Sequence, residues 1–600
     1  MNRPEGRWYA PIIGSSSILV TCTGVVLLLI MLRVWIGPFS LVTSPVGAIQ
    51  SPKGVTIWEP ESGRSRPSIE RERRFNAWKA LLPDSVVVHV TRDLAAAPVR
   101  GRELVIVSDA ARLTDDESQV LLDHLRAGGS ALLTGWIGVP EGERGTRTRM
   151  RRLLDVESIE ALPKEASYFV AAAKRGPLVA GLLPSERLGL GIDSVVPAID
   201  HGEAELVWTD WSLRSGGEMV GASRRRSVGR GRLVWLAPVP ESAIGDAGTR
   251  NHLRQVIAGA IAWMGWQPYA ELLAWPRAAP FAGLFAIDSE DQFQNARRVA
   301  AAAEQHDLPI TFMVLSGVAK QSPEVLAGLA RLGEIGSHAD VHDGFETVSY
   351  EQQRQRLARS RDDLRALGID EIHGFRPPYE SYDDATERAL AALGFVYVLG
   401  DDVRHAMVPR IVSPDGTGSR LVMIPRAVAD DYELIVTRKI EQTADLEKQM
   451  RKDLERVERR GGLYYFSFHT QFFGTSERIA LLTRMGELLR KEHAWLVTGR
   501  ELADWWRRRA GCLVGVKAAG RHRLRIRVTN QGDQVLHGAA VRIHMNVPTL
   551  QAEVSGTGFF QARPELYLEP GSERLDLVLP DLAPGKNYAY DLDFQTDPRP

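Results

Sequence analysis

The stretch Gly333-Glu-Ile-Gly-Ser-His-Ala-Asp-Val-His-Asp-Gly-Phe345 joins a short apolar segment to two histidines placed four residues apart. Neutral imidazole is the commonest protein ligand for zinc-like ions, so His338 and His342 could bind one divalent cation together. Spacing alone is weak support, because a chain with 14 His can form such a pair by chance in a polar surface loop. The pair gains weight only from the sequence around it.

Short aliphatic segments alternate with amphipathic helical patterns on both sides of this stretch. The predicted strands are 281–287, 310–314, 334–337, 372–375, 395–399, 421–424, 463–468 and 494–497, and the helices between them include 322–332, 350–367, 383–393, 443–459 and 477–492. Strand-then-helix order is typical of a barrel of parallel strands with active groups at the strands' carboxyl ends. We therefore predict a distorted (β/α) barrel over residues 269–511.

Chemically capable side chains follow four of these predicted strands, where a barrel would bring them together. They are Asp288, Glu290 and Asp291 after the first strand, His338 and His342 after the third, Arg376 after the fourth, and His469 after the seventh. A cation held by two histidines and one carboxylate keeps positions open for water and substrate. Taken singly, these residues could be a helix cap, a structural ion pair or a buried histidine. Their joint placement favours a metal site.

Residues 280–510 resemble the polysaccharide deacetylase superfamily, the NodB-homology domain. His338-Ala-Asp-Val-His342 is similar to the family's second motif, Arg376-Pro-Pro-Tyr379 to its third, and Leu463-Tyr-Tyr-Phe-Ser-Phe-His469 to its closing strand. The resemblance implies a hydrolase that removes N-acetyl groups from a polysaccharide with a divalent metal, for which Zn²⁺ is expected.

The resemblance also implies a role for each site residue. Asp288 would be the base and His469 the acid that protonates the departing amine. Arg376 would hold Asp288 ionised and oriented, and the backbone N–H of Tyr379 would stabilise the oxyanion. His338 and His342 would bind the metal with one carboxylate.

The sequence departs from the family pattern at three places. The first motif reads Asp288-Ser-Glu290-Asp291 in place of two adjacent aspartates, so Glu290 and Asp291 both stand as candidate ligands. Ala339 replaces the hydroxyl residue that usually braces the histidine loop, and a looser site is expected from that change. The fourth motif, an aspartate pair near a tryptophan, has only Asp401-Asp402 as a counterpart.

Residues 11–32 form an apolar segment without a charge, long enough for a transmembrane signal-anchor. The basic residues before it predict a cytoplasmic N-terminus over 1–10, and the Gly- and Pro-containing segment 33–52 reads as a linker. A cleaved signal peptide is the alternative, although no small-x-small site ends the segment. The expected location is the bacterial inner membrane, single-pass, with the body outside the cytoplasm.

Residues 53–268 read as an α/β domain in which short aliphatic strands flank a helix. The segment 104–135 resembles glutamine-amidotransferase-like, flavodoxin-type domains. Active members use a cysteine nucleophile, whereas this chain has only Cys22 and Cys512, so thiol catalysis is excluded. Residues 512–600 show apolar residues at every second position and predict a small β-sandwich, a spacer or interaction module with carbohydrate binding as an alternative.

The composition is that of a globular protein with several domains: 600 residues, 44% hydrophobic and 25% charged. A net charge of -1 gives no general attraction to nucleic acid, so no nucleic-acid partner is expected. The expected partners are an N-acetylated polysaccharide, the membrane and polysaccharide synthesis or export machinery. Two alternatives stand beside the deacetylase: a catalytically degenerate glycan-binding or assembly protein, and a related amidohydrolase acting on a small amide.

Overall fold

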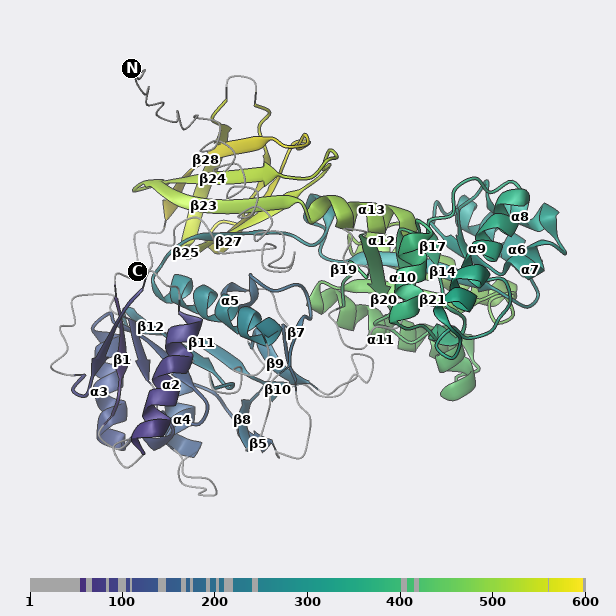
Figure 1. Ribbon diagram of the computed structural model, residues 1–600. Helices are drawn as coiled ribbons and strands as arrows, with labels where there is room; N and C mark the ends of the chain where they lie inside the picture. The colour runs from purple at the N-terminus through teal and green to yellow at the C-terminus, as the bar shows by residue number, and fades with distance from the viewer. Residues whose placement is uncertain are drawn as a thin grey trace, which may run out of the picture. The chain divides into compact units, whose positions relative to one another are not determined.

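The computed structural model (Figure 1) describes residues 54–60, 67–82, 86–94, 104–107, 110–138, 147–162, 169–172, 176–189, 195–200, 204–209, 220–239, 247–400, 407–414, 420–558 and 561–596. The predicted N-terminal segment 1–10, anchor 11–32 and linker 33–52 lie outside these residues. None of the described helices combines the length and the apolar character needed to cross a bilayer. The 18-residue helix α5 (Ala247–Met264), for example, carries Arg250 and Arg254. The predicted location in the inner membrane is corrected on this finding.

A curled sheet forms the framework of the region predicted as a barrel. Its hydrogen-bonded order is β19-β20-β18-β17-β16-β15-β14-β21, with β22 paired to β14, and all neighbours are parallel except β19 and β20. The strands are β14 (Ala282–Ser289), β15 (Thr311–Val314), β16 (Glu334–Ser337), β17 (Gly374–Phe375), β18 (Tyr397–Gly400), β19 (Arg410–Val412), β20 (Leu421–Pro425), β21 (Leu463–His469) and β22 (Trp495–Leu496). No ladder closes β20 onto β21 in the described part of the chain, so the sheet is a half-barrel.

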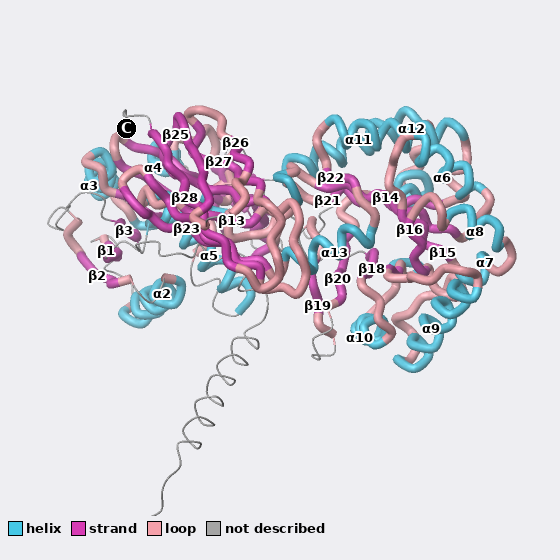
Figure 2. Tube along the Cα trace, turned by 90° about the horizontal axis from the view of Figure 1, so that it is seen from above, coloured by secondary structure: helices cyan, strands magenta, loops and turns pink. Residues whose placement is uncertain are grey.

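Helices surround the strands of this sheet, as Figure 2 shows from above. They are α6 (Asn295–Gln305), α7 (Ser316–Ala319), α8 (Pro323–Leu329), α9 (Tyr350–Ala366), α10 (Asp384–Ala392), α11 (Thr443–Arg460), α12 (Ser476–Lys491) and α13 (Gly499–Arg509). Local sequence sets their ends: a capping box of Ser349 and Gln352 starts α9, and left-handed Gly461 ends α11.

Side chains alternate between two apolar cores along β14 and β21. On β14, Phe285 and Ile287 pack with the surrounding helices, whereas Leu284 and Ala286 face the interior core. On β21, Phe466 and Phe468 belong to the first core and Tyr465 to the second. Because successive strand residues point to opposite faces, this phase directs Asp288, Ser467 and His469 towards the interior at the carboxyl ends of their strands.

The N-terminal region contains the predicted α/β pattern and a second, antiparallel sheet. The first sheet has the order β11-β12-β4-β3-β1-β2 and is parallel except for β11. Its elements are β1 (Gly54–Trp58), α2 (Ser68–Leu81), β2 (Val87–Thr91), β3 (Leu104–Val107), α3 (Asp115–Arg126), β4 (Ser130–Thr134), α4 (Arg147–Leu154), β11 (Ser223–Val228), β12 (Gly231–Leu236) and α5. The second sheet contains β5 (Ile159–Leu162), β6 (Phe169–Ala172), β7 (Arg187–Leu188), β8 (Val196–Ile199), β9 (Leu206–Thr209) and β10 (Val220–Gly221). The resemblance to amidotransferases stays a prediction.

The C-terminal region is antiparallel, as its alternating apolar residues indicate. Its strands are β23 (Cys512–Gly520), β24 (Arg523–Asn530), β25 (Ala540–Gly556), β26 (Glu565–Tyr567), β27 (Ser572–Val578) and β28 (Asn587–Thr596). They form one connected sheet in the order β23-β24-β28-β25-β27-β26, and the long β25 also pairs with β13 (Tyr269–Leu272). Residues 269–272, predicted as the start of the barrel domain, thus contribute a strand to this sheet.

Candidate active site

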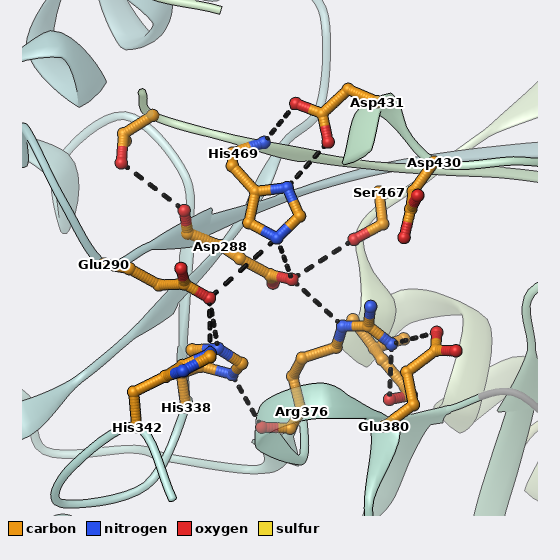
Figure 3. Close-up of polar contacts among 12 residues, drawn as sticks. Asp288, Glu290, His338, His342, Arg376, Glu380, Asp430, Asp431, Ser467 and His469 are labelled. Atoms are coloured by element: carbon orange, nitrogen blue, oxygen red, sulfur yellow. Dashed lines mark hydrogen bonds and ion pairs between the residues drawn. The ribbon is translucent and has the colours of Figure 1, made fainter. Parts of the chain in front are cut away.

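Asp288 and His469 face each other at the carboxyl ends of two paired strands (Figure 3). They are partners in the β14–β21 register, and His469 Nε2 lies 3.7 Å from Asp288 Oδ2. Asp288 Oδ2 also accepts hydrogen bonds from Arg376 Nε at 3.1 Å and Ser467 Oγ at 3.4 Å. Asp288 is 1% exposed, and its Oδ1 is buried without a hydrogen-bond partner. Because a buried carboxylate oxygen is costly to leave unpaired, Oδ1 is suited to accept a proton from a bound molecule.

One oxygen of Glu290 lies between two imidazoles. Glu290 Oε1 is 2.7 Å from His342 Nε2 and 3.1 Å from His338 Nε2. His338 Nδ1 lies 2.8 Å from the carbonyl oxygen of Arg376, which can only accept, so Nδ1 carries the proton and a neutral ring presents a lone pair at Nε2. Burial alone would raise the pKa of Glu290, but His338 and His342, which donate hydrogen bonds to it when they are protonated at Nε2, hold this pKa well below its ordinary value.

This donor set fits a divalent cation. The ligand atoms of Glu290, His338 and His342 all lie within 4.8 Å of one another, and so do those of Asp288, Glu290 and His469. A neutral Nε2 lone pair facing a carboxylate oxygen is repulsive unless a proton or a cation lies between them. Two histidines and a carboxylate are also a common ligand set of catalytic zinc.

A buried carboxylate holds His469 from behind. His469 Nδ1 is 2.6 Å from Asp431 Oδ1, and the backbone N–H of His469 donates to Asp431 Oδ2 at 2.7 Å. Burial alone would lower the pKa of His469, but Asp431, aided by Asp288 and Glu290, outweighs burial and raises this pKa to about 10. His469 is therefore suited to carry a proton on Nε2 and to donate it towards Asp288 and Glu290.

Arg376 and Tyr379 extend the site from the end of β17. Arg376 is 3% exposed, and its guanidinium joins Asp288 to Glu380, whose Oε1 it meets at 2.9 Å. Tyr379 is 73% exposed, and its ring packs edge-on against His342 with centroids 4.3 Å apart. Tyr379 therefore lies at the rim, next to the paired histidines.

The structure brings together seven of the eight residues predicted from sequence: Asp288, Glu290, His338, His342, Arg376 and His469, with Tyr379 at the rim. Asp291 is exposed, and only its backbone carbonyl takes part nearby, accepting Thr470 Oγ1 at 2.5 Å. Asp401 and Asp402, the predicted counterpart of the fourth motif, lie outside the described residues. Of the two candidate carboxylate ligands, only Glu290 contacts the histidines.

Sequence reasoning missed Asp431. The run Asp430-Asp431-Tyr432 follows β20 and is an aspartate pair beside a tyrosine, whereas the fourth motif was sought as an aspartate pair near a tryptophan. A second aspartate pair was therefore visible in the sequence, after β20 rather than after β18.

The histidine loop is braced despite Ala339. Ser337 Oγ accepts the N–H of Ala339 at 3.2 Å, and the carbonyl of Ala339 accepts the N–H of Ser316 at 3.0 Å. Arg356 binds Asp340 Oδ1 at 2.9 Å and donates to the carbonyls of three loop residues, Val341, Asp343 and Gly344. These contacts supply the support that the missing hydroxyl was expected to give.

Part of the chain is similar in sequence to a known protein family. The family model described as polysaccharide deacetylase matches residues 288–398. A comparison with curated proteins finds no match.

The solved structures that match this chain are distant from it in sequence. A putative polysaccharide deacetylase from Mycobacterium smegmatis is 20% identical, with 39% of this chain and 92% of that chain covered and a TM-score of 0.35. A probable polysaccharide deacetylase from Pseudomonas aeruginosa PAO1 is 16% identical, with 39% of this chain and 93% of that chain covered and a TM-score of 0.35. Agd3, described as a novel carbohydrate deacetylase, covers more of the chain: 11% identity, 89% of this chain, 98% of that chain and a TM-score of 0.41.

The family assignment rests on the sequence match, which begins at Asp288 and includes both histidines and Arg376. It confirms the predicted enzyme class, a hydrolase acting on carbon–nitrogen bonds other than peptide bonds. Residues 288–398 belong to a polysaccharide deacetylase domain.

Proposed function

We propose that the protein removes N-acetyl groups from an N-acetylated polysaccharide and depends on a divalent cation, with Zn²⁺ as the expected ion. The observation that carries this proposal is the approach of Glu290 Oε1 to the Nε2 atoms of His338 and His342, beside the unpartnered Oδ1 of Asp288. Glu290, His338 and His342 would hold the cation. When bound, the cation supplies Lewis acidity to the amide carbonyl and to water.

The chain's own groups would move the protons. Asp288 would accept a proton from the attacking water, because its buried Oδ1 has no other partner. His469, protonated and held by Asp431, would donate from Nε2 to the amide nitrogen as the carbon–nitrogen bond breaks. The products are acetate and a free amino sugar. Arg376 would orient Asp288, and the N–H of Tyr379 is the proposed donor to the oxyanion.

Exposed aromatic rings beside the site support a sugar substrate. Tyr379 is 73% exposed next to His342, and Tyr432 is 52% exposed next to Phe472, whose ring packs edge-on against His469. Aromatic faces provide apolar area against which sugar rings can stack. Two such rings, one beside each half of the site, suit a chain of sugars better than a small amide.

The proposal is tested by measuring acetate release from N-acetylglucosamine oligomers with the purified full-length protein. We expect turnover that a chelator abolishes and added Zn²⁺ restores, and we expect His338→Ala to abolish it. His306→Ala is the matched control, since His306 is a half-exposed histidine of the same domain paired with Glu487. If chelation and His338→Ala both leave acetate release unchanged, the proposed mechanism is wrong.

A further inference from the structure

We infer that Glu380 and Arg426 form a positioning pair that holds the base Asp288 through Arg376 and steadies the segment carrying Asp431. The inference rests on the proposed function, because it names residues that act through the proposed base and acid. Their side-chain hydrogen bonds and ion pairs go to each other, Arg376 and the segment 428–433, and the pair is thus distinct from the candidate metal ligands. The two residues are 46 positions apart and follow different strands.

Glu380 is clamped between two buried guanidinium groups. Arg426 donates to it in a bidentate manner, with Nε 2.7 Å from Oε1 and a terminal nitrogen 2.9 Å from Oε2. Arg376 donates to the same Oε1 at 2.9 Å (Figure 3). The side chains of both arginines are 4% exposed, and that of Glu380 is 19% exposed. Paired charge-assisted bonds of this kind fix both the direction and the plane of a guanidinium group.

Arg376 transmits this fixation to Asp288. Its Nε donates to Asp288 Oδ2 at 3.1 Å while a terminal nitrogen is held by Glu380 and reaches the carbonyl of Leu399 at 3.4 Å. Without the carboxylate of Glu380, the guanidinium could rotate about its remaining bonds. Asp288 would then lose its fixed position 3.7 Å from His469 Nε2.

Arg426 also contacts the segment that carries the partner of His469. One of its terminal nitrogens lies 3.5 Å from Asp430 Oδ2, and the other donates to the carbonyl of Val428 at 3.0 Å. Asp430 directly precedes Asp431, which binds His469. The guanidinium of Arg426 thus contacts Glu380, which is linked to the base Asp288 through Arg376. It also contacts Asp430, next to the residue that binds the acid His469.

Glu380 has a backbone conformation that is unusual for a residue with a side chain. Tyr379 and Glu380 have φ values of 57° and 54°, in the left-handed region that side chains seldom adopt. Glycine would adopt this conformation freely. Strained residues of this kind persist where the surroundings fix them, and they gather at functional sites. At Glu380 the contacts that fix the strained conformation are the hydrogen bonds from Arg376 and Arg426.

The test compares Glu380→Gln, Arg426→Lys and the double variant with the wild type. Glu380→Gln keeps the shape of the side chain, and Arg426→Lys keeps a positive charge. We expect each single variant to lower kcat about 10–100-fold with KM and bound metal unchanged, as for the loss of other residues that orient a reactive group. The double variant should be no worse than the poorer single variant, because both changes break one unit.

The matched control is Asp576→Asn, which changes a carboxylate in another bidentate arginine pair, with Arg542 in the C-terminal sheet. It should lower stability without changing kcat. Unchanged kcat in both single variants would overturn the inference.

Crystal structures of the variants give a readout that needs no turnover. We expect the Arg376–Asp288 contact to be lost or reoriented in Glu380→Gln; an unmoved Arg376 would overturn the inference. A wild type without deacetylase activity would instead contradict the proposed function, and the crystal structure would still decide the role of the pair.

Discussion

His469 Nδ1 lies 2.6 Å from Asp431 Oδ1, and the same carboxylate accepts the backbone N–H of His469 at 2.7 Å. These two bonds fix both the plane of the ring and its tautomer, so that Nε2 faces Asp288. A buried carboxylate behind an imidazole also stabilises the imidazolium form. Asp431, 38 positions away in sequence, thus orients His469, the acid of the proposed reaction, and stabilises its protonated form.

The first prediction concerns this pair. Asp431→Asn should lower kcat at neutral pH by about 10²-fold or more, the usual contribution of a general acid. Asp431 raises the pKa of His469, so the imidazolium is present below that pKa and is lost as pH rises through it. Without the carboxylate that loss occurs at lower pH. The alkaline limb of the kcat profile, measured from pH 5 to 10, should therefore move to lower pH.

Asp453→Asn is the control for this prediction, because Asp453 is a buried aspartate of the same domain that pairs with Arg456 on α11. It should leave the shape of the profile unchanged. An Asp431→Asn enzyme with the wild-type alkaline limb would show that His469 is not the acid.

The second prediction separates the two candidate carboxylate ligands. Glu290→Gln should weaken Zn²⁺ binding by more than about 100-fold, since even residues that only support a ligand cost about 10–100-fold. Asp291→Asn should retain the ion, because its exposed side chain is outside the histidine cluster. Metal content after dialysis against a competing chelator measures both. Loss of the ion in Asp291→Asn, with retention in Glu290→Gln, would reverse the assignment.

Much of this site was predictable because it follows the period-two rule of a strand. The predicted strand 334–337 coincides with β16, and the predicted strand 463–468 falls one residue short of β21. The same rule favours Glu290 over Asp291, because Glu290 continues the inward phase of Leu284, Ala286 and Asp288.

The remaining features depend on distant contacts that no local pattern encodes. Asp401-Asp402 and Asp430-Asp431 both follow a strand, so the sequence offered no reason to choose between them. The role of Glu380 depends on a left-handed turn that places its carboxylate between two arginines, one of them 46 residues away. The pairing of β13 with β25, likewise, joins segments about 270 residues apart.

A third prediction tests the packing beneath the site. A Cβ added at Gly374 would lie 2.1 Å from the ring of Tyr397, a buried residue whose hydroxyl donates to Glu334 at 2.6 Å. Gly374→Ala should therefore destabilise the protein by about 1–3 kcal/mol, the usual cost of overpacking a core. The measurement is the shift in the urea unfolding midpoint.

Gly328→Ala is the matched control. Gly328 lies in α8 with no atom within 4 Å of an added Cβ, so alanine should stabilise the helix by roughly 0.5–1 kcal/mol. Shifts of the same sign for the two substitutions would contradict this description of the core.

The last prediction uses the charge of Glu380. Burial alone would raise its pKa, but Arg426 and then Arg376 outweigh burial and hold the pKa well below the ordinary value of 4.5. A carboxyl group whose pKa is lowered by folding stabilises the protein above its unfolded pKa, and this contribution is lost as pH falls below that value. The free energy of unfolding of the wild type should therefore be higher than that of Glu380→Gln, and this difference should be larger at pH 7 than at pH 3.5. Between pH 7 and pH 3.5 the difference should decrease by about 1.4 kcal/mol, because pH 3.5 lies one unit below the ordinary pKa and each unit corresponds to that free energy. Urea unfolding of both proteins at the two pH values measures this difference, and an equal difference would mean that the two arginines do not hold Glu380 ionised.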